Sequence, residues 1–469
     1  MTLILYYLIF ESIIRIFTIY EDFKEASGAT LNEAKTKISL MGNAKIDNVS
    51  NEYKTFVTEQ LKIYGFLISR DGLEIEDNWE EVKNTVSSLA TTIPHKEMSY
   101  YAKINVVQTY FLSKMWYLSS IITPASGMYK SIEKSIDAYL WYPTKTNVIN
   151  KLILKRSREQ GGIAYPDVYM KILAFRLMLL IRRFKAQQKA VWHDTFDFFY
   201  DRVKNVAARN LDQVKVPPLY REIRKAELQS SFLLLENNVG FGLGAKIFSW
   251  KHVKTKILYE HMIEKKVGKA TTAIETYWKY RLDTRNIDFS GYFRLNRTKY
   301  VDGYTRSIHY ALFYRALYTN SKLSNFTDVQ PYCKHCLALQ ELEQEDVYHV
   351  FIDCGRVEEF WPNVEKVLQK IDASFTLSNE NKLFGLIGPR NSNKFLIANF
   401  IVQSAQRVIW TARKKYEDKE LKIDLWDALQ TRLYVLIKRL EICNNQRFVD
   451  IFSKSSLVVY TGKNWKVKI

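Results

Sequence analysis

Cysteine and histidine side chains are concentrated in one short segment of this sequence. Cys333 and Cys336 form a C-x2-C pair, and His349 and Cys354 follow shortly after it. Three of the chain's 4 cysteines lie in this segment, a clustering that chance would rarely produce. A C-x2-C turn presents two thiolates from one knuckle, and a nearby histidine and cysteine complete a tetrahedral set. The spacing therefore predicts a zinc site.

The predicted ligand set leaves no free coordination position. Three thiolates and one imidazole fill a tetrahedral zinc, so we expect Zn²⁺ to stabilise the fold and not to activate water. His335 is an alternative ligand, but it lies between the two cysteines of the C-x2-C pair, where its geometry is poor. The competing interpretation, ordinary buried cysteines near a surface histidine, does not explain the clustering.

The composition favours a multidomain chain with a polyanionic partner. A length of 469 residues with 47% hydrophobic residues is sufficient for about two to four domains with their own cores. Lysine and arginine outnumber aspartate and glutamate by 69 to 50, and the formal net charge is +19. Such an excess favours nucleic acid or an anionic membrane surface as a partner. Only Cys443 lies outside the zinc segment, a pattern that indicates a reducing, intracellular compartment.

The N-terminal part of the chain predicts short strands and one helix. Residues 2–10 are almost wholly apolar, and we predict a buried strand there. A secretory signal or membrane anchor is the alternative, but no basic region precedes the run, Glu11 interrupts it, and it is too short to span a bilayer. Helical spacing follows over residues 12–26 and ends at Gly28. Residues 61–72 predict two short strands that turn at glycines.

Most of the remaining chain is predicted to be helical. Apolar spacing predicts helices from residue 78 to residue 142, with Pro94 and Pro124 as breaks. Residues 394–416 and 424–442 repeat apolar side chains at steps of three and four, which predicts two helices packed as a hairpin on the zinc module. The predicted fold class is therefore α+β and predominantly helical.

Several ordered motifs add to this interpretation. Residues 27–32 read SGATLN and are followed by Lys35, and residues 63–72 read IYGFLISRDG. Further motifs are SKMWY at residues 113–117, YLW at residues 139–141 and GGIAYPD at residues 161–167. In this order, and with the zinc segment after them, they resemble reverse transcriptases of non-LTR (LINE-type) retrotransposons. The family usually has leucine at the position of Tyr64.

The resemblance implies an architecture and an activity. It implies a palm remnant with a primer-grip-like hairpin (residues 1–75), a helical thumb (76–190), a basic aromatic connecting region (191–310), a reverse-transcriptase-type zinc-binding domain (311–370), and a C-terminal helical hairpin with a basic tail (371–469). The family performs RNA-directed DNA synthesis primed at a nicked chromosomal target. RNA, RNA–DNA hybrid or target DNA are the implied partners, and the nucleus and cytoplasm are the implied locations.

The sequence lacks the carboxylates that this family uses to polymerise. Polymerisation requires two or three carboxylates that hold two divalent metals, and the family has them on a Tyr-x-Asp-Asp loop just before the strand expected at residues 2–10. No Asp-Asp pair occurs in this sequence. Residues 20–23, YEDF, lie on the helix before Gly28 and do not correspond to that loop. We therefore predict no catalytic residue, assign Mg²⁺ only to a full-length parent enzyme, and expect no DNA synthesis by this chain alone.

The middle of the chain allows two interpretations. Residues 191–300 combine aromatic and basic side chains, which can stack unpaired bases while the cations bind phosphate. A helical core with a solvated basic face is the alternative that we favour. Residues 240–246, GFGLGAK, lack the full spacing of a phosphate-binding loop, and we predict a turn. Residues 296–322, which include His309, lead into the zinc segment and are expected to dock it.

Seven residues are the predicted nucleic-acid contacts. They are Lys35, Gly65, Arg156, Arg158, Arg413, Lys414 and Lys415. The resemblance implies that Lys35 lies near the incoming nucleotide and that Gly65 belongs to the primer grip. A surface lysine and a glycine required for a tight strand turn are the ordinary alternatives. Cations near a helix C-terminus are also a common structural feature, which is the alternative for Arg413 and its neighbours.

Two hypotheses of different classes follow. The first is a truncated retrotransposon reverse transcriptase that retains binding of RNA or RNA–DNA hybrid through its basic thumb and zinc domain. The second is a zinc-stabilised protein-interaction module without a nucleic-acid role. Nucleic-acid binding weakens steeply with salt because counterions are released, whereas an apolar protein interface responds little. Neither hypothesis involves a membrane.

Overall fold

The structure is a computed structural model, and it describes most of the chain. The described residues are 11–30, 32, 35–40, 45–70, 72–94, 98–124, 127–142, 149–186, 188–235, 240–250, 253–268, 273–295, 300–389, 392–443, 451–452, 455, 458–460 and 465–467. They are predominantly helical and contain three small antiparallel sheets, which confirms the predicted fold class. The strand predicted at residues 2–10 lies outside them.

The N-terminal region contains one helix and one three-stranded sheet. Helix α1 (Glu11–Ser27) ends at Gly28, which has a positive φ of 69°, as the sequence predicted. Strands β1 (Gln60–Ile63), β2 (Phe66–Ser69) and β3 (Gly72–Leu73) pair antiparallel in that order. Tyr64 and Gly65 form the turn of the β1–β2 hairpin with φ of 48° and 85°. A two-residue turn of this kind matches the twist of its strands, so the hairpin prediction is confirmed.

A helical bundle follows the hairpin. It contains α2 (Ile75–Thr92), α3 (Tyr100–Val106), the π-turn η4 (Val107–Phe111), α4 (Leu112–Ser119) and α5 (Met128–Trp141). Helix α2 packs against α4 and α5. Trp79 and Val86 of α2 are buried, as are Ile132 and Ile136 of α5, at helical spacing. The bundle therefore follows from the apolar periodicity.

Residues 149–268 add a short helix and a loop, whose Leu154, Ile163 and Tyr165 belong to the core of the bundle, and then a lobe with its own sheet and core. The elements of this segment are α6 (Lys151–Lys155), α7 (Val168–Lys185), α8 (Trp192–Tyr200), α9 (Pro218–Ser230), β4 (Phe232–Leu234), β5 (Gly240–Leu243), β6 (Lys246–Ser249) and α10 (Thr255–Val267). The sheet has the order β4-β5-β6. The turn predicted at residues 240–246 is wrong for most of its length, because strand β5 occupies it and only Gly244 and Ala245 turn. Phe241 and Leu243 alternate into the core, and a Cβ at Gly240 would clash with the Phe248 carbonyl of β6.

The aromatic residues of the segment 191–300 serve mainly as core. Phe196, Tyr200 and Trp278 are buried, whereas Trp192 and Phe198 remain exposed. The packing agrees with the hydrophobic-core interpretation, although a sheet as well as helices provides the core.

The C-terminal module surrounds one long helix. Its elements are α11 (Ala273–Arg281), α12 (Phe289–Leu295), α13 (Gly303–Phe313), α14 (Asn320–Leu323), α15 (Lys334–Ala338), the π-turn η9 (His349–Asp353), α16 (Gly355–Glu358), α17 (Phe360–Gln369), α18 (Asn379–Phe384), α19 (Asn393–Lys419), α20 (Leu425–Cys443), β7 (Val458–Tyr460) and β8 (Trp465–Val467). Helix α19 packs against α13, α17, α20 and η9. The predicted helical hairpin on the zinc module is confirmed within a few residues.

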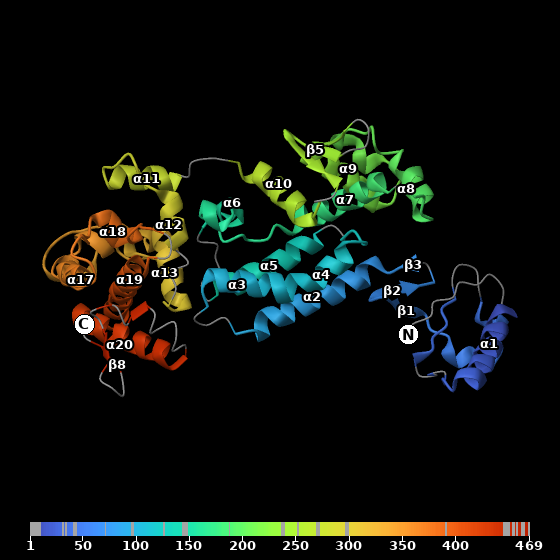
Figure 1. The fold of residues 1–469 in the computed structure, drawn as a ribbon, viewed down its shortest axis with the longest axis horizontal. Helices are drawn as coiled ribbons and strands as arrows, with labels where there is room; N and C mark the ends of the chain where they lie inside the picture. Colours follow the sequence, from blue (N-terminus) through green and yellow to red (C-terminus); the bar gives the residue numbers. More distant parts are fainter. Residues whose placement is uncertain are drawn as a thin grey trace.

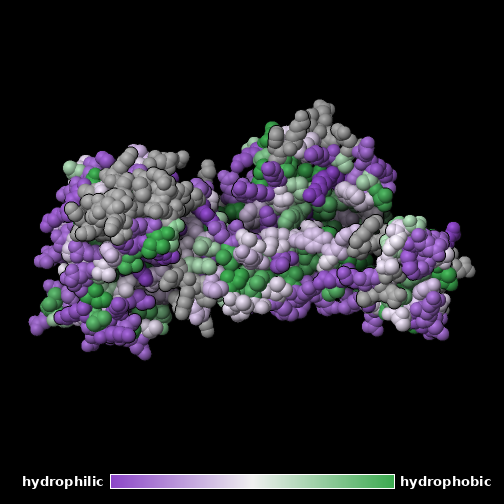
Figure 2. Space-filling model, turned by 60° about the horizontal axis from the view of Figure 1, so that its bottom comes forward, coloured by the Kyte–Doolittle hydropathy of each residue, from purple (hydrophilic) through white to green (hydrophobic). Residues whose placement is uncertain are grey.

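The molecule is elongated (Figure 1). Helix α1 lies at one end, the C-terminal module at the other, and α7 to α10 form a lobe beside the central bundle. One hydrophobic core joins the central bundle to the C-terminal module, and a second core fills the lobe. Figure 2 shows a largely hydrophilic surface with hydrophobic patches on both the bundle and the C-terminal module. No helix in the described ranges combines the length and the hydropathy needed to cross a bilayer.

Candidate zinc site and basic aromatic surface

The four predicted zinc ligands meet in one buried cluster. The ligand atoms of Cys333, Cys336, His349 and Cys354 all lie within 4.8 Å of one another. The Sγ atoms of Cys333 and Cys354 are 3.9 Å apart, and Cys336 Sγ lies 3.5 Å from His349 Nε2. Sulfur ligands at a Zn–S distance of about 2.3 Å would be roughly 3.8 Å apart at tetrahedral corners. The sequence prediction of the cluster is confirmed, and the cluster could hold a structural zinc ion.

Two local structures bring the ligands together. Cys333 immediately precedes the short helix α15, which contains Cys336, and the backbone N–H of Cys333 donates to the Glu343 carbonyl at 2.9 Å. His349 begins the π-turn η9, and the N–H of Cys354 donates to the His349 carbonyl at 2.9 Å. A π-turn closes bonds between residues five apart, which is the His349–Cys354 separation. The four residues between His349 and Cys354 are therefore the number that one π-turn requires.

The electrostatics of the cluster favour a cation. The Sγ atoms of Cys333 and Cys354 are in hydrogen-bond contact, and this contact lowers the pKa of Cys354 to about 3 against the effect of burial. The same contact, together with burial, raises the pKa of Cys333 well above its ordinary value. Burial raises the pKa of Cys336 to about 11. Burial thus opposes ionisation of Cys333 and Cys336, and a bound divalent cation would supply the charge that stabilises their thiolates.

Histidine roles in this segment are distinct. Burial alone would lower the pKa of His349, but its hydrogen bond with Cys354 raises that pKa overall. The backbone N–H of His349 donates to Asp346 Oδ1 at 2.7 Å, which orients the start of the π-turn. His335 lies outside the cluster, with its ring edge-on to Tyr416, so the sequence analysis selected the correct histidine.

The prediction that Arg413 contacts nucleic acid is wrong. Its guanidinium is buried and pairs with Glu345 at 2.6 Å, while it also donates to Asn320 at 2.7 Å. Glu345 belongs to the zinc knuckle hairpin and also accepts from the Asn320 N–H at 2.9 Å. The ion pair fastens the knuckle to α19, so Arg413 is unavailable to an external phosphate. The neighbouring Lys414 and Lys415 are exposed.

The other predicted contacts lie in separate places. Lys35 is exposed near the N-terminal helix, and Gly65 is exposed at the tip of the β1–β2 hairpin. Arg158 is half-buried, stacks over the Tyr101 ring at 5.3 Å and donates to Asn105 at 2.7 Å. The hairpin and α19, which carries Lys414 and Lys415, lie far apart along the molecule (Figure 1). The structure therefore does not gather these residues into a single site.

Arg156 and Arg158 border a large cleft. The cleft has a volume of about 1190 Å³ and lies between the α6–α7 loop, α10 and α12. Its cationic lining residues are Lys155, Arg156, Arg158, Lys171 and Lys256, and its anionic ones are Glu159, Glu260, Glu264, Glu275 and Asp288. Burial lowers the pKa of Lys171. With both charge signs intermixed, the cleft shows no preference for a polyanion.

An exposed tyrosine surface is the feature that the sequence analysis did not assign. Tyr110, Lys114 and Tyr117 are exposed and follow at steps of four and three, which places them on one side of the η4–α4 helix. Tyr117 packs on Phe66 of the hairpin with ring centroids 5.0 Å apart, and Tyr64 is exposed at the hairpin tip. We call Tyr64, Tyr110, Lys114 and Tyr117 the tyrosine face. Its helical spacing in residues 110–117 was the available signal.

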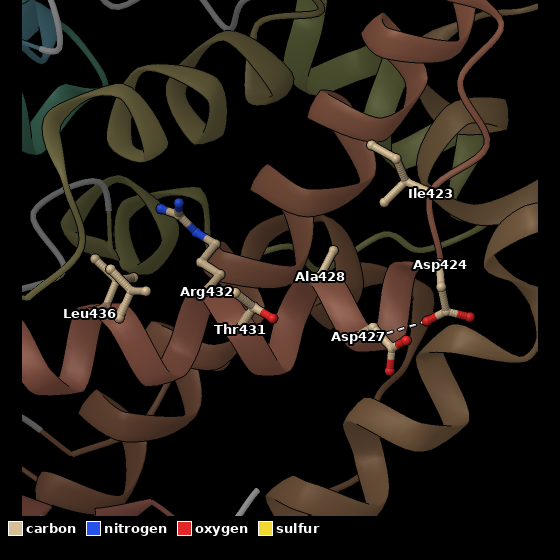
Figure 3. Close-up of a pocket in the computed structure, with 8 residues that line it drawn as sticks. Ile423, Asp424, Asp427, Ala428, Thr431, Arg432 and Leu436 are labelled. Atoms are coloured by element: carbon tan, nitrogen blue, oxygen red, sulfur yellow. Dashed lines mark hydrogen bonds between the residues drawn. The ribbon is translucent and has the colours of Figure 1, made fainter.

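A shallow groove on α20 has a structural explanation. The groove, of about 540 Å³, has Asp424 and Asp427 towards one end and Arg432 further along the helix (Figure 3). The Asp427 N–H donates to Asp424 at 2.8 Å, and Arg432 pairs with Asp302. Asp302 in turn caps the N-terminus of α13. The Arg432–Asp302 pair joins α20 to α13, and the charges of the groove do not converge on a reacting position.

No family model matches the chain, and a search of curated proteins finds no match.

Proposed function

We propose that this chain binds RNA or RNA–DNA hybrid as the thumb and zinc region of a LINE-type reverse transcriptase. The observation that carries the proposal is the tyrosine face, on which the exposed residues Tyr110 and Tyr117 flank Lys114 along one helix, and Tyr117 packs on Phe66 of the glycine-turned hairpin. The ordered motifs of the sequence support the family assignment. The net charge of +19 supports a polyanionic partner.

The chemistry of the tyrosine face suits a nucleic-acid strand. Aromatic side chains stack on bases or sugars without regard to sequence, and a lysine between them neutralises a phosphate. Gly65 has no side chain of its own, so a nucleic-acid strand could approach the hairpin backbone closely at this position. A Cβ at that position would still lie 3.6 Å from the Tyr117 ring, so the glycine and the ring form one continuous surface.

We further propose that Zn²⁺ occupies the cysteine–histidine cluster and acts only structurally. The four ligands fill the coordination sphere, and the Glu345–Arg413 pair transmits the order of the knuckle to α19. Because the sequence has no Asp-Asp pair, binding and not polymerisation is the function that we assign to these residues. An extension assay with Mg²⁺, primer, template and nucleotides should yield no product.

The test is an affinity measurement with a labelled RNA–DNA hybrid. Fluorescence anisotropy over a salt series should show a steep loss of affinity with salt, and Lys114→Ala should reduce that slope by about one unit. Tyr117→Ala should weaken binding about 5- to 160-fold, because one stacking contact contributes about 1–3 kcal/mol.

The matched control is Tyr434→Ala. Tyr434 of α20 is 51% exposed, close to the 54% of Tyr117, but it lies in the C-terminal module. Equal losses for the two tyrosine variants, or an affinity insensitive to salt, would contradict the tyrosine face as the binding surface.

A further inference from the structure

The turn that follows the C-x2-C pair exposes three leucines. Leu337, Leu339 and Leu342 are 40%, 58% and 69% exposed, although all three lie within six residues of one another. Single exposed leucines are ordinary on protein surfaces. Three on one short turn form a patch, and such patches mark interaction sites.

Backbone hydrogen bonds hold this leucine turn in one conformation. The N–H groups of Leu339 and Glu341 both donate to the Cys336 carbonyl at 2.9 Å, and the Gln340 N–H donates to Leu337 at 3.0 Å. Cys336 itself is buried in the zinc cluster. The leucines are therefore presented by a hydrogen-bonded turn next to the candidate zinc cluster, and a partner would not have to order a loop.

The exposed charged residues between and beside Leu339 and Leu342 are acidic. Glu341 and Glu343 are exposed beside them, and residues 335–355 contain no lysine or arginine in a chain of net charge +19. Within the parts of the chain that the structure describes, neither carboxylate forms an ion pair. Carboxylates at this position would repel a phosphate backbone. The patch has the composition of a protein interface, with an apolar centre and a charged rim.

We propose that Leu337, Leu339 and Leu342 form a docking site for a partner protein whose apolar contact surface is bordered by lysine or arginine. Charge complementarity selects this occupant, because the two glutamates of the rim favour cations and disfavour nucleic acid. The site is separate from the tyrosine face and does not depend on nucleic-acid binding.

The test uses a defined probe. A labelled synthetic amphipathic helix with leucines along one face and lysines on both borders of that face is titrated with the zinc-loaded full chain, alongside a matched helix that carries glutamates. The lysine helix should bind saturably, at least about tenfold more tightly than the glutamate helix. The double variant Glu341→Lys/Glu343→Lys should reverse this preference.

Variants of the leucines test whether these side chains themselves bind the probe helix. Leu339→Ser/Leu342→Ser should abolish binding of the lysine helix while zinc content and affinity for RNA–DNA hybrid stay unchanged. Leu421→Ser is the matched control, because Leu421 is an exposed leucine (49%) on the α19–α20 connection. No saturable binding of the lysine helix, an unreversed preference, or equal losses in the two leucine variants would overturn the proposal. A loss of hybrid affinity in the double leucine variant would instead assign the turn to nucleic acid and also overturn it.

Discussion

At the scale of single residues, Arg413 shows that a partner distant in sequence can decide whether a cation is buried or exposed. Arg413, Lys414 and Lys415 are consecutive cations near the end of a helix, and sequence alone treats them alike. Only Arg413 points into the protein, where Glu345, 68 residues away, accepts its hydrogen bonds. A buried pair of this kind costs desolvation energy, and the loss of one partner leaves an unpaired charge inside.

The first prediction concerns this pair. Arg413→Met should destabilise the chain by about 3–5 kcal/mol, because Glu345 would remain buried without its cation. The double variant Glu345→Leu/Arg413→Met should recover much of that loss, since it removes both charges. Urea unfolding followed by circular dichroism gives both values. If the losses of Arg413→Met and of Glu345→Leu simply add in the double variant, the two residues do not couple.

The second prediction concerns the metal cluster. Cys336→Ser should lose zinc and increase hydrogen exchange in residues 333–360, because a metal bound at the cluster would join the two ligand-bearing turns. The helical bundle before residue 142 should keep its protection. Cys443→Ser is the control, since Cys443 is exposed and outside the cluster. Stoichiometric zinc retained by Cys336→Ser would refute the assignment.

At the scale of elements, helix α19 organises the C-terminal module through polar contacts as well as packing. Gln406 of α19 donates to the carbonyls of Lys382 and Leu383 at 2.9 Å each, so its amide oxygen faces His309. His309 of α13 lies 3.0 Å from that oxygen through Nδ1. Because an amide oxygen only accepts, Nδ1 carries the proton. One buried contact therefore joins α13, α18 and α19.

The third prediction follows from that contact. Burial lowers the pKa of His309 from 6.5 to about 4, although the bond to Gln406 opposes this shift. Above pH 6.5 the histidine is neutral in both states. As the pH falls towards 4 only the unfolded chain takes up the proton, so the folded state should lose about 3 kcal/mol.

The pH series needs a reference, because the zinc cluster also titrates. Urea unfolding of His309→Gln at the same pH values supplies it, and this part of the pH dependence should be missing from the variant. Parallel curves for the two proteins between pH 6.5 and 4 would contradict a buried neutral histidine.

At the scale of the whole molecule, one glycine loop joins the central bundle to the C-terminal module. The hydroxyl groups of Tyr310 and Tyr314 on α13 donate to the Gly161 carbonyl at 3.1 Å and 2.6 Å. Gly161 has a φ of 83°, and a Cβ there would lie 2.5 Å from the Phe293 ring. The shared core of bundle and module therefore depends on the absence of a side chain at this position.

The fourth prediction tests that dependence. Gly161→Ala should cost about 2–5 kcal/mol, which combines a left-handed backbone with overpacking. Gly127→Ala is the matched control, because Gly127 has a φ of 89° and nothing within 4 Å of its Cβ position. It should cost only about 1–2 kcal/mol for the backbone conformation. Equal shifts of the thermal midpoint for both variants would contradict close docking at Gly161.

The sequence by itself determined the features that depend on short separations. The four ligands of the metal cluster, the glycine-turned hairpin and the α19–α20 pair all follow from local spacing, because ligand geometry and helical periodicity act over a few residues. The strand at Gly240–Leu243 was missed, since its glycines suggested a turn while its burial depends on neighbouring strands.

The tertiary structure alone decided which surface residues are available. The burial of Arg413, the contact between His309 and Gln406, and the docking of Gly161 against Tyr310 join residues from 68 to 149 positions apart. The exposure of the leucine turn and of the tyrosine face is likewise set by what the rest of the chain leaves uncovered. Local patterns specify elements, whereas the pairing of charges and the exposure of side chains depend on long-range packing, because burial is a property of the assembled fold.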